Sequence, residues 1–202
     1  MKISMGSLAL VLVKPLLLLV AVKPLAAWGS DSLQPFHYAF PVHDLPLAKH
    51  FYGEVLGLSE GRSSQKWQDY SLDGHQIVCH LVSSDYRCQD YYNPVDGDRV
   101  PVPHSGLAMT EGQFHLFAER LRKHDVKFIV DPHLRFKGQP GEQWTMFFKD
   151  PSGNNLEFKA MTNPSNLFAK YNVDEYAYDA EAKAERKENV PGVDTTIETD
   201  EM

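Results

Sequence analysis

The stretch His37–Leu45, with the sequence HYAFPVHDL, begins a pattern that the chain repeats further on. In the first unit a histidine opens a short apolar run, and a helix-like segment and several strand-like segments follow. The second unit opens in the same way at His104 and closes on Asn155–Lys159, NLEFK. An internal repeat that puts metal-binding residue types at matching places is hard to explain by packing alone. The candidates on the opening and closing strands of the units are His37, His80, His104 and Glu157.

The first unit has clear start and stop signals. Asp44 can accept hydrogen bonds from the free amides of a first helical turn, and apolar residues then recur at spacings of three and four up to Gly57, which ends the helix. Asp73-Gly74 is a strong hairpin signal between two later strands. The predicted strands of this unit are 35–42, 58–63, 66–72 and 75–82.

The second unit follows a polar stretch, 83–103, which is interpreted as a linker. Thr110 is predicted to cap a helix with one apolar side. Asp150–Asn154, DPSGN, has proline and glycine in turn-forming positions. The predicted strands of this unit are 104–109, 127–130, 143–149 and 155–161.

These residues resemble a known superfamily. The signature His37-x-x-x-x-Val42-x-Asp44-Leu45, together with Asp150–Asn154 leading to Glu157, is similar to the vicinal oxygen chelate proteins, which include glyoxalases, extradiol dioxygenases and bleomycin-resistance proteins. The likeness covers about Phe36 to Met161. The resemblance implies an α+β fold of two tandem βαβββ modules that form one curled, cup-like mixed sheet with the helices outside. Small single-domain proteins related to extradiol dioxygenases resemble the chain most, and the stretch His133–Trp144 adds to that likeness.

The resemblance also implies a metal site. His37, His104 and Glu157 match the ligand positions of the superfamily and make a 2-His-1-carboxylate triad. That set suits Fe(II) with open positions for substrate and oxygen, and Zn, Ni, Co or Mn are the alternatives. The residues themselves favour a ligand role, because a glutamate in an apolar strand needs a partner.

Other candidate residues have more than one interpretation. His80 is predicted to be either the acid/base group or a fourth ligand, and a core histidine is the third interpretation. Arg135 and Lys137 lie in a segment expected to loop over the mouth of the cup, where cations could bind an acidic or enolate oxygen; a solvated surface loop is the alternative. Phe147 departs from the extradiol pattern, which has a substrate-holding tyrosine ten residues before the glutamate ligand.

The predicted function is that of a metal-dependent enzyme acting on a small-molecule substrate with two adjacent oxygens. With Fe(II) it would be a ring-cleavage dioxygenase, and with Zn, Ni, Co or Mn a lyase or isomerase. Two non-enzymatic alternatives stay open: a ligand-binding module of the same fold without catalysis, and a metal-bearing interaction module whose tail recruits a partner.

Composition limits the partners. The chain has 202 residues and a formal charge of −7, which argues against nucleic acid as the main partner. A hydrophobic fraction of 43% is enough for a real core, and two unclustered cysteines make no disulfide framework. A homodimer is compatible with the fold.

The two ends differ from the middle. Residues 1–33 hold two apolar runs separated by Lys14-Pro15 and no acid before Asp31. They are interpreted as a targeting or signal-like segment, a membrane anchor, or an extension without function. The compartment is therefore left open, with organelle targeting and secretion as the alternatives. The expected domain spans 34–170, with modules at 34–83 and 103–162, and the acidic tail 171–202 is predicted to be disordered.

Overall fold

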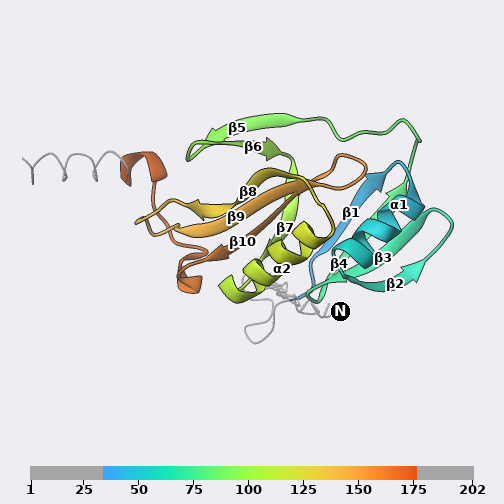
Figure 1. Cartoon of the computed structure of the whole chain (residues 1–202), viewed down its shortest axis with the longest axis horizontal. Coiled ribbons are helices and arrows are strands. Elements are labelled where there is room, and N and C mark those ends of the chain that lie inside the picture. Colours follow the sequence, from blue (N-terminus) through green and yellow to red (C-terminus); the bar gives the residue numbers. More distant parts are fainter. Residues whose placement is uncertain (1–33, 177–202) are drawn as a thin grey trace, which may run out of the picture. The chain divides into compact units, whose positions relative to one another are not determined.

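A computed structural model describes residues 34–176 of the chain (Figure 1). The predictions for 1–33 and for the tail beyond residue 176 lie outside the described residues. Within the described part, no helix is long and apolar enough to cross a membrane.

The first module has the predicted order of elements (Figure 1). Its helix α1 continues directly into a π-helical turn, η2, so the two form one helical segment. The elements are β1 (His37–Val42), α1 (Leu45–Lys49), η2 (His50–Val55), β2 (Ser59–Ser63), β3 (Trp67–Leu72) and β4 (His75–Leu81).

The second module repeats this order, and a short hairpin precedes it. The hairpin strands are β5 (Tyr91–Val95) and β6 (Asp98–Val102). The module consists of β7 (His104–Ala108), α2 (Glu111–Lys123), β8 (Phe128–Arg135), β9 (Gln143–Lys149) and β10 (Asn155–Met161), and a 3-10 turn, η3 (Pro164–Asn166), follows it.

Each module makes one mixed four-stranded sheet. The strand orders are β1-β4-β3-β2 and β7-β10-β9-β8, so the two sheets have the same topology. In each, the first strand runs parallel to the last strand of its module, and the other pairs are antiparallel. The α+β class and the tandem βαβββ modules are thus confirmed. The eight strands are divided between two sheets, with β1 and β7 each at a sheet end.

The helix ends follow from the predicted capping residues. The Asp44 carboxylate accepts a hydrogen bond from the Leu47 amide, 2.9 Å away. Thr110 and Gln113 form a reciprocal capping box at the start of α2. Gly57 has φ of 78°, a left-handed conformation suited to glycine at the end of a helix.

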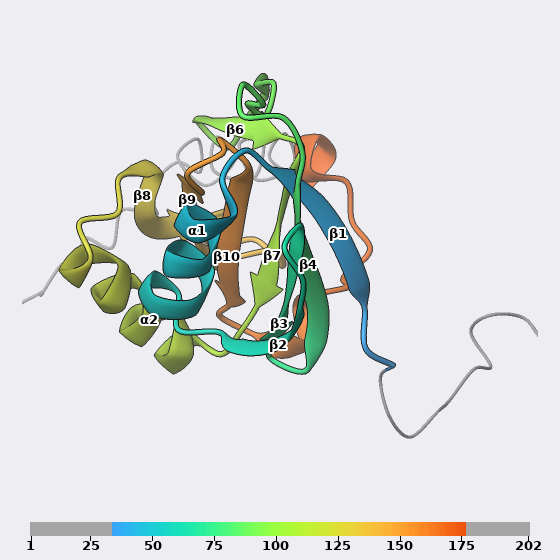
Figure 2. The ribbon, with the colours of Figure 1, turned by 90° about the vertical axis from the view of Figure 1, so that its right-hand side faces the viewer.

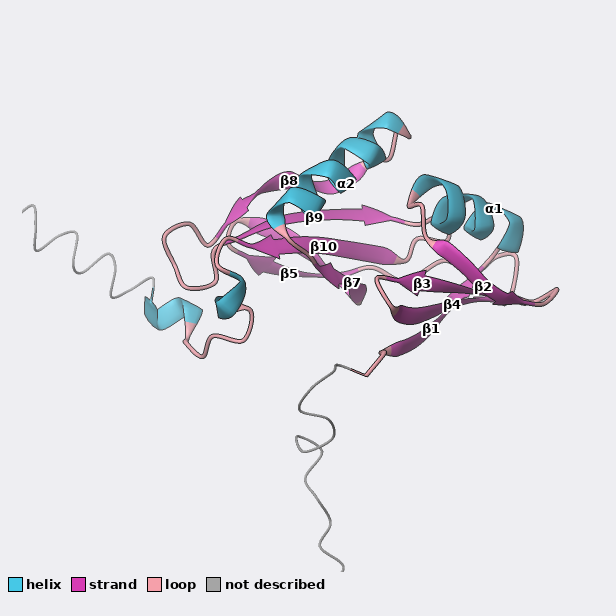
Figure 3. Ribbon diagram, turned by 90° about the horizontal axis from the view of Figure 1, so that it is seen from below, coloured by secondary structure: helices cyan, strands magenta, loops and turns pink. Residues whose placement is uncertain are grey.

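The polar stretch 83–103, predicted to be a linker, contains the β5–β6 hairpin instead. Its turn residues Asp96 and Gly97 both have positive φ, 49° and 83°, as a tight hairpin turn requires. Val100 of β6 packs against Val130 and Phe147 of the second sheet. Figure 3 shows α2 on one side of this sheet and β5 on the other. The prediction failed because the hairpin strands are polar and contain prolines, which suits a small ribbon outside the main sheets.

Strand β8 is longer than predicted and ends at Arg135. Its pairing with β9 shifts register between Phe128 and Val130 and again between Val130 and His133. Such irregularities let a strand continue through Asp131-Pro132, which looks like a break in the sequence. Arg135 therefore belongs to a strand rather than to the expected loop, which covers only 136–142.

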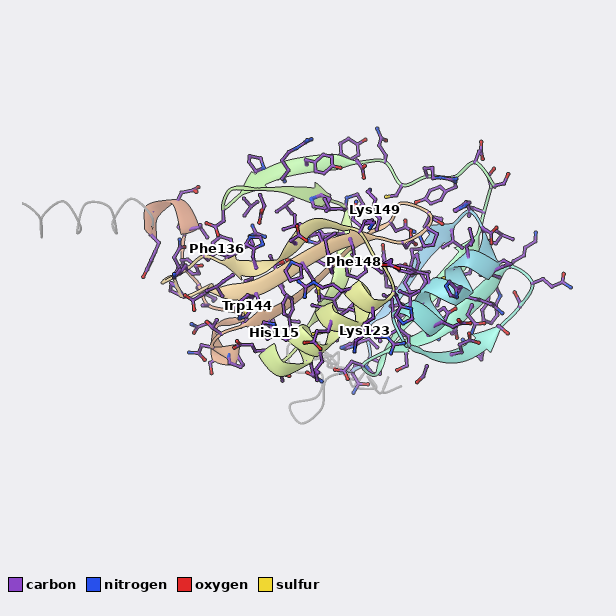
Figure 4. The ribbon with its side chains drawn as sticks, in the orientation of Figure 1. His115, Lys123, Phe136, Trp144, Phe148 and Lys149 are labelled. Carbon is purple, nitrogen blue, oxygen red and sulfur yellow. The ribbon has the colours of Figure 1, made fainter. Side chains whose placement is uncertain are left out.

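Both helices pack on one face of the sheets, over a core shared by the two modules (Figure 2). Phe51 of η2 lies 6.3 Å from Phe148 of β9, measured between ring centroids. On the second sheet, Trp144 lies beside His115 of α2, with ring centroids 4.7 Å apart, and donates to Glu111 (Figure 4).

The turn between β9 and β10 connects the modules through Asp150. This carboxylate is buried and accepts four hydrogen bonds. One comes from the Tyr52 hydroxyl of the first module, at 3.0 Å. Three come from the turn itself: the amides of Ser152 and Asn154, each at 2.8 Å, and the Asn154 side chain at 2.7 Å.

Two further contacts extend this network to β1 and the residue that follows it. Asn154 Nδ2 donates to the Pro41 carbonyl, and the Ser152 hydroxyl accepts from the His43 amide at 3.0 Å. The turn predicted from DPSGN is thus also a polar connection between the two halves of the domain, beside the hydrogen bonds of Arg120 to the Val55 and Glu54 carbonyls.

We predict that Asp150→Ala lowers the free energy of unfolding by about 3 kcal/mol, because several buried donors lose their acceptor at once. Urea unfolding followed by circular dichroism measures this change. Asp131→Ala is the matched control, since Asp131 is exposed, and it should change stability by less than about 0.5 kcal/mol. Equal midpoints for the two variants would contradict the role assigned to the turn.

Candidate metal centre

His104 and Glu157 form a close pair on neighbouring strands of the second sheet. In the parallel ladder of β7 and β10, His104 pairs with Asn155 and Gly106 with Glu157. Side chains of alternate residues share a face, so His104 and Glu157 point to the face opposite the helices. His104 Nε2 lies 3.2 Å from Glu157 Oε2.

The other ring nitrogen of His104 determines what this pair can do. Nδ1 lies 2.7 Å from the Pro101 carbonyl oxygen, which can only accept, so Nδ1 carries a proton. Nε2 and the carboxylate would then both present lone pairs to each other unless a cation lies between them. That cation is either a second proton on the imidazole or a metal ion.

The surroundings keep Glu157 ionised. Burial acts to raise the pKa of Glu157, but the His104 hydrogen bond, the Lys159 charge and the Thr145 hydroxyl outweigh it and lower the pKa. Thr145 Oγ1 donates to Glu157 Oε1 at 2.9 Å. The Glu157 hydrogen bond and, less strongly, the Pro101 carbonyl raise the pKa of His104 against the effect of burial. The pair therefore favours a cation, either a proton or a metal ion, between His104 Nε2 and Glu157 Oε2.

A buried aromatic ring, Phe147, lies beside the pair. The Phe147 ring stands edge-on to the His104 ring, with centroids 5.3 Å apart, and is fully buried. Phe147 lies directly opposite Glu157 in the β9–β10 ladder. The position that holds a tyrosine in extradiol dioxygenases thus offers no hydroxyl to a substrate.

His37 lies on the corresponding face of the first sheet, in a separate polar chain. Its Nδ1 is 2.8 Å from Gln76 Oε1, and Gln76 Nε2 donates to Asp69 at 2.8 Å. Asp69 also accepts from Arg62 Nε at 3.1 Å. Because the amide nitrogen of Gln76 is used by Asp69, its oxygen faces His37, and Nδ1 of His37 is the protonated nitrogen. The Nε2 lone pair of His37 is then left to bind a cation.

The structure brings together two of the three predicted ligands. Among residues 34–176, no group of three His, Cys, Asp or Glu side chains is close enough to hold a metal ion. The donor set of His104 and Glu157 fits part of a 2-His-1-carboxylate site, and His37 presents a suitable nitrogen on the other sheet. The assignment of all three residues to one metal stays a prediction.

His80 is exposed and lies on the same face of the first sheet as His37. It pairs with Pro41, whereas Gln76 pairs with His37. Four residues along a strand correspond to roughly 13 Å, so Gln76, not His80, lies beside His37. The predicted acid/base or ligand role of His80 stays a prediction.

Arg135 is buried under the β5–β6 hairpin. Its Nε lies 3.3 Å from Asp98 Oδ2, and its Nη2 donates to the Val95 carbonyl at 2.8 Å. Lys137 is exposed in the loop that precedes Gln143. Gln143 pairs with Met161 of β10, and Met161 is four residues, or roughly 13 Å, along the strand from Glu157. Their proposed contacts with substrate stay predictions.

Sequence reasoning missed several residues around the site. Thr145, Lys159, Gln76 and Asp69 all lie on the same sheet faces as the candidate ligands. The period of two along the strands already places Lys159 on the face of Glu157 and Gln76 on the face of His80, although it assigns no role to either. The partners on β3 and β9 depend on strand register, which the sequence does not reveal.

The family model described as "Glyoxalase/Bleomycin resistance protein/Dioxygenase superfamily" matches residues 34–158, more than half of the chain. The chain belongs to this superfamily. A search of curated proteins finds no match.

Solved structures of this fold are similar to the chain. One is a glyoxalase/bleomycin resistance protein/dioxygenase from Alicyclobacillus acidocaldarius, with 29% identity over 67% of this chain and 96% of that chain, and a TM-score of 0.57. A lactoylglutathione lyase from Agrobacterium tumefaciens has 16% identity over 69% and 99% of the two chains, with a TM-score of 0.48. The fosfomycin resistance protein FosX from Listeria monocytogenes has 18% identity over 68% and 98%, with a TM-score of 0.47.

We predict that Gly106→Ala disrupts the site from the backbone. A Cβ atom at Gly106 would lie 1.6 Å from the Glu157 carbonyl oxygen, so β7 must move away from β10. The expected loss of stability is about 3 kcal/mol or more, measured by urea unfolding. Gly112→Ala is the control, because a Cβ there has no neighbour within 4 Å, and in a helix alanine should stabilise by roughly 0.5–1 kcal/mol. Similar stability of the two variants would contradict this close approach.

Proposed function

We propose that this protein is a metal-dependent enzyme acting on a small substrate with two adjacent oxygens. The observation that carries the proposal is the 3.2 Å approach of His104 Nε2 to Glu157 Oε2, with the proton of the neutral ring held on the opposite nitrogen by Pro101. Membership of the superfamily supports the same class of chemistry.

The residues that would hold the metal are His104, Glu157 and His37. When bound there, a divalent metal supplies Lewis acidity that stabilises an enolate or catecholate form of the substrate. Fe(II) is the favoured ion, because a 2-His-1-carboxylate set leaves positions open; Zn, Ni, Co and Mn are the alternatives.

The protein's own groups have distinct tasks in this proposal. Pro101 and Thr145 fix the orientations of the imidazole and the carboxylate. Phe147 excludes water from beneath them. His80, exposed on the face that carries His37 but four residues along β4 from Gln76, stays the proposed acid/base group or fourth ligand.

The second candidate is a lyase or isomerase without oxygen chemistry. The phenyl ring of Phe147 favours it, because the site lacks the hydroxyl that extradiol enzymes use at this position. A ligand-binding module without catalysis is the third outcome that the same experiment distinguishes.

We predict that anaerobically purified protein retains stoichiometric metal, measured by plasma mass spectrometry. With iron bound, oxygen uptake on catechol supports the dioxygenase; stoichiometric zinc or nickel without oxygen uptake supports the lyase or isomerase. Absence of metal after iron or zinc supplementation would favour the binding module.

Variants test the ligands in the same measurement. Glu157→Ala and His104→Ala should each lower metal affinity by more than about 100-fold, which exceeds the usual cost of losing a residue behind a ligand. His124→Ala, a change at an exposed histidine after α2, should retain full metal. Full metal content in either ligand variant would show that the assignment is wrong.

We also propose that a second copy of the chain completes the site. Both β1 and β7 are end strands with one unpaired edge, and such edges can meet another chain. The face with His37 of one copy would then meet the face with His104 and Glu157 of the other, as a twofold dimer allows.

We predict that mixing His37→Ala with Glu157→Ala protein, after dissociation and reassociation, restores metal binding. In a site shared between chains, each mixed dimer has one intact ligand set, so about a quarter of the wild-type metal should return when subunits exchange at random. Size-exclusion chromatography with light scattering checks the dimer, and mass spectrometry counts the metal. Each variant reassociated alone is the control, and no recovery from a mixed dimer would contradict a shared site.

A further inference from the structure

Lys159 lies next to the candidate metal pair on the same strand. It follows Glu157 by two residues on β10, so both side chains are on one face of the sheet. Its Nζ atom is 3.9 Å from Glu157 Oε2, the oxygen that faces His104. The side chain is one-third exposed, so its ammonium group can meet a molecule that arrives from solvent.

The charge of Lys159 is only loosely paired. A separation of 3.9 Å is too long for a hydrogen bond, and Glu157 is its one acidic partner among the ion pairs of residues 34–176. When the Glu157 oxygen is shared with His104 and a cation, Lys159 has a positive charge to offer a ligand.

Two other cations of this face are already neutralised. Lys149, labelled in Figure 4, contacts Asp90 at 2.5 Å and the Gly153 carbonyl at 3.1 Å. Arg135 is held by Asp98 and the Val95 carbonyl under the hairpin. Lys159 therefore differs from both in having its charge available beside the pair.

The strand next to Lys159 presents small, exposed residues. On the β7 side, the residues paired with Glu157 and Lys159 are Gly106 and Ala108. Both are exposed and small, and β7 is the end strand of its sheet. On the other side stand Phe147 and Thr145. The half-open side of Lys159 thus faces the small residues of the end strand, and its ammonium group is reachable from solvent there.

We propose that Lys159 binds a carboxylate that the substrate carries directly beside its two adjacent oxygens. The ammonium group of lysine is a compact point charge, so it can pair with one singly charged carboxylate without the two-point geometry that arginine requires. Because Lys159 Nζ is 3.9 Å from Glu157 Oε2, a carboxylate bound to Lys159 would lie next to substrate oxygens placed at the His104–Glu157 pair. This inference rests on the proposed function and specifies its substrate class.

The test compares three probes on zinc-loaded protein by isothermal titration calorimetry, since zinc has no redox chemistry and the probes are not consumed. Catechol has no carboxylate, 2,3-dihydroxybenzoate has one beside the diol, and 3,4-dihydroxybenzoate has one across the ring. Wild-type protein should bind 2,3-dihydroxybenzoate roughly tenfold more tightly than catechol, a ratio that corresponds to about 1.4 kcal/mol.

Variants assign this preference to Lys159. Lys159→Met should abolish the tenfold ratio while leaving catechol affinity within about twofold, and Lys159→Arg, which keeps the charge, should retain most of it. Lys149→Met is the matched control, a lysine on the same sheet face with its charge already paired, and should keep the ratio. Circular dichroism melting confirms that each variant is folded.

The outcomes separate the two claims. Binding of all probes with the same carboxylate preference in Lys159→Met would overturn the role of Lys159 and leave the proposed function standing. Tighter binding of 3,4- than of 2,3-dihydroxybenzoate would overturn the adjacent placement of the carboxylate. Failure of wild-type protein to bind zinc or any probe would overturn the proposed function, and with it this inference.

Discussion

The candidate site of this domain depends on the parallel pairing of β7 with β10. That ladder puts an imidazole and a buried carboxylate 3.2 Å apart, and a buried carboxylate without a partner would be costly. The ladder is close enough that only glycine fits at position 106, where the Glu157 carbonyl occupies the place of a side chain. The close approach of β7 to β10, which requires glycine at position 106, therefore also sets the distance between His104 and Glu157.

Each module has a histidine whose Nδ1 atom is held by a hydrogen bond, but the acceptors differ. In the second module, Nδ1 of His104 donates to the Pro101 carbonyl. In the first module, Nδ1 of His37 donates to the side-chain oxygen of Gln76, and the Gln76 amide nitrogen donates to Asp69. In both cases Nε2 is the nitrogen that can bind a cation. Such matched orientation on two sheets is expected if both histidines serve one kind of site, and the Asp150 turn, with its hydrogen bond to Tyr52, ties the two modules together.

The face that carries His104 is also where the chain has added structure to the repeat. The β5–β6 hairpin packs on this face and uses Asp98 to neutralise Arg135, which would otherwise be a natural anion ligand. The charge of Lys159 is only weakly paired, and it lies beside the His104–Glu157 pair. Phe147 lies opposite Glu157 and offers no hydroxyl, so the surroundings of the pair are an aromatic ring, the Thr145 hydroxyl and the Lys159 charge.

The sequence alone determined the repeat, the fold class and most element ends. Local signals carry these features: Asp44 and Thr110 cap helices, Asp73-Gly74 makes a tight turn with both φ values positive, and β9 and β10 have the predicted bounds. The hairpin at 91–102 escaped notice because its polar strands lack a core-facing period, although its Asp96-Gly97 turn was visible.

Only the tertiary structure decided which side chains meet. The partners of His37, Glu157 and Arg135 come from other strands or from the hairpin, and strand register selects them. A shift of one residue would turn each of these side chains to the opposite face. The residue types that can bind a metal are thus written in the chain, but their hydrogen-bond partners, their accessible nitrogens and the one loosely paired lysine beside them follow from long-range pairing that no local pattern encodes.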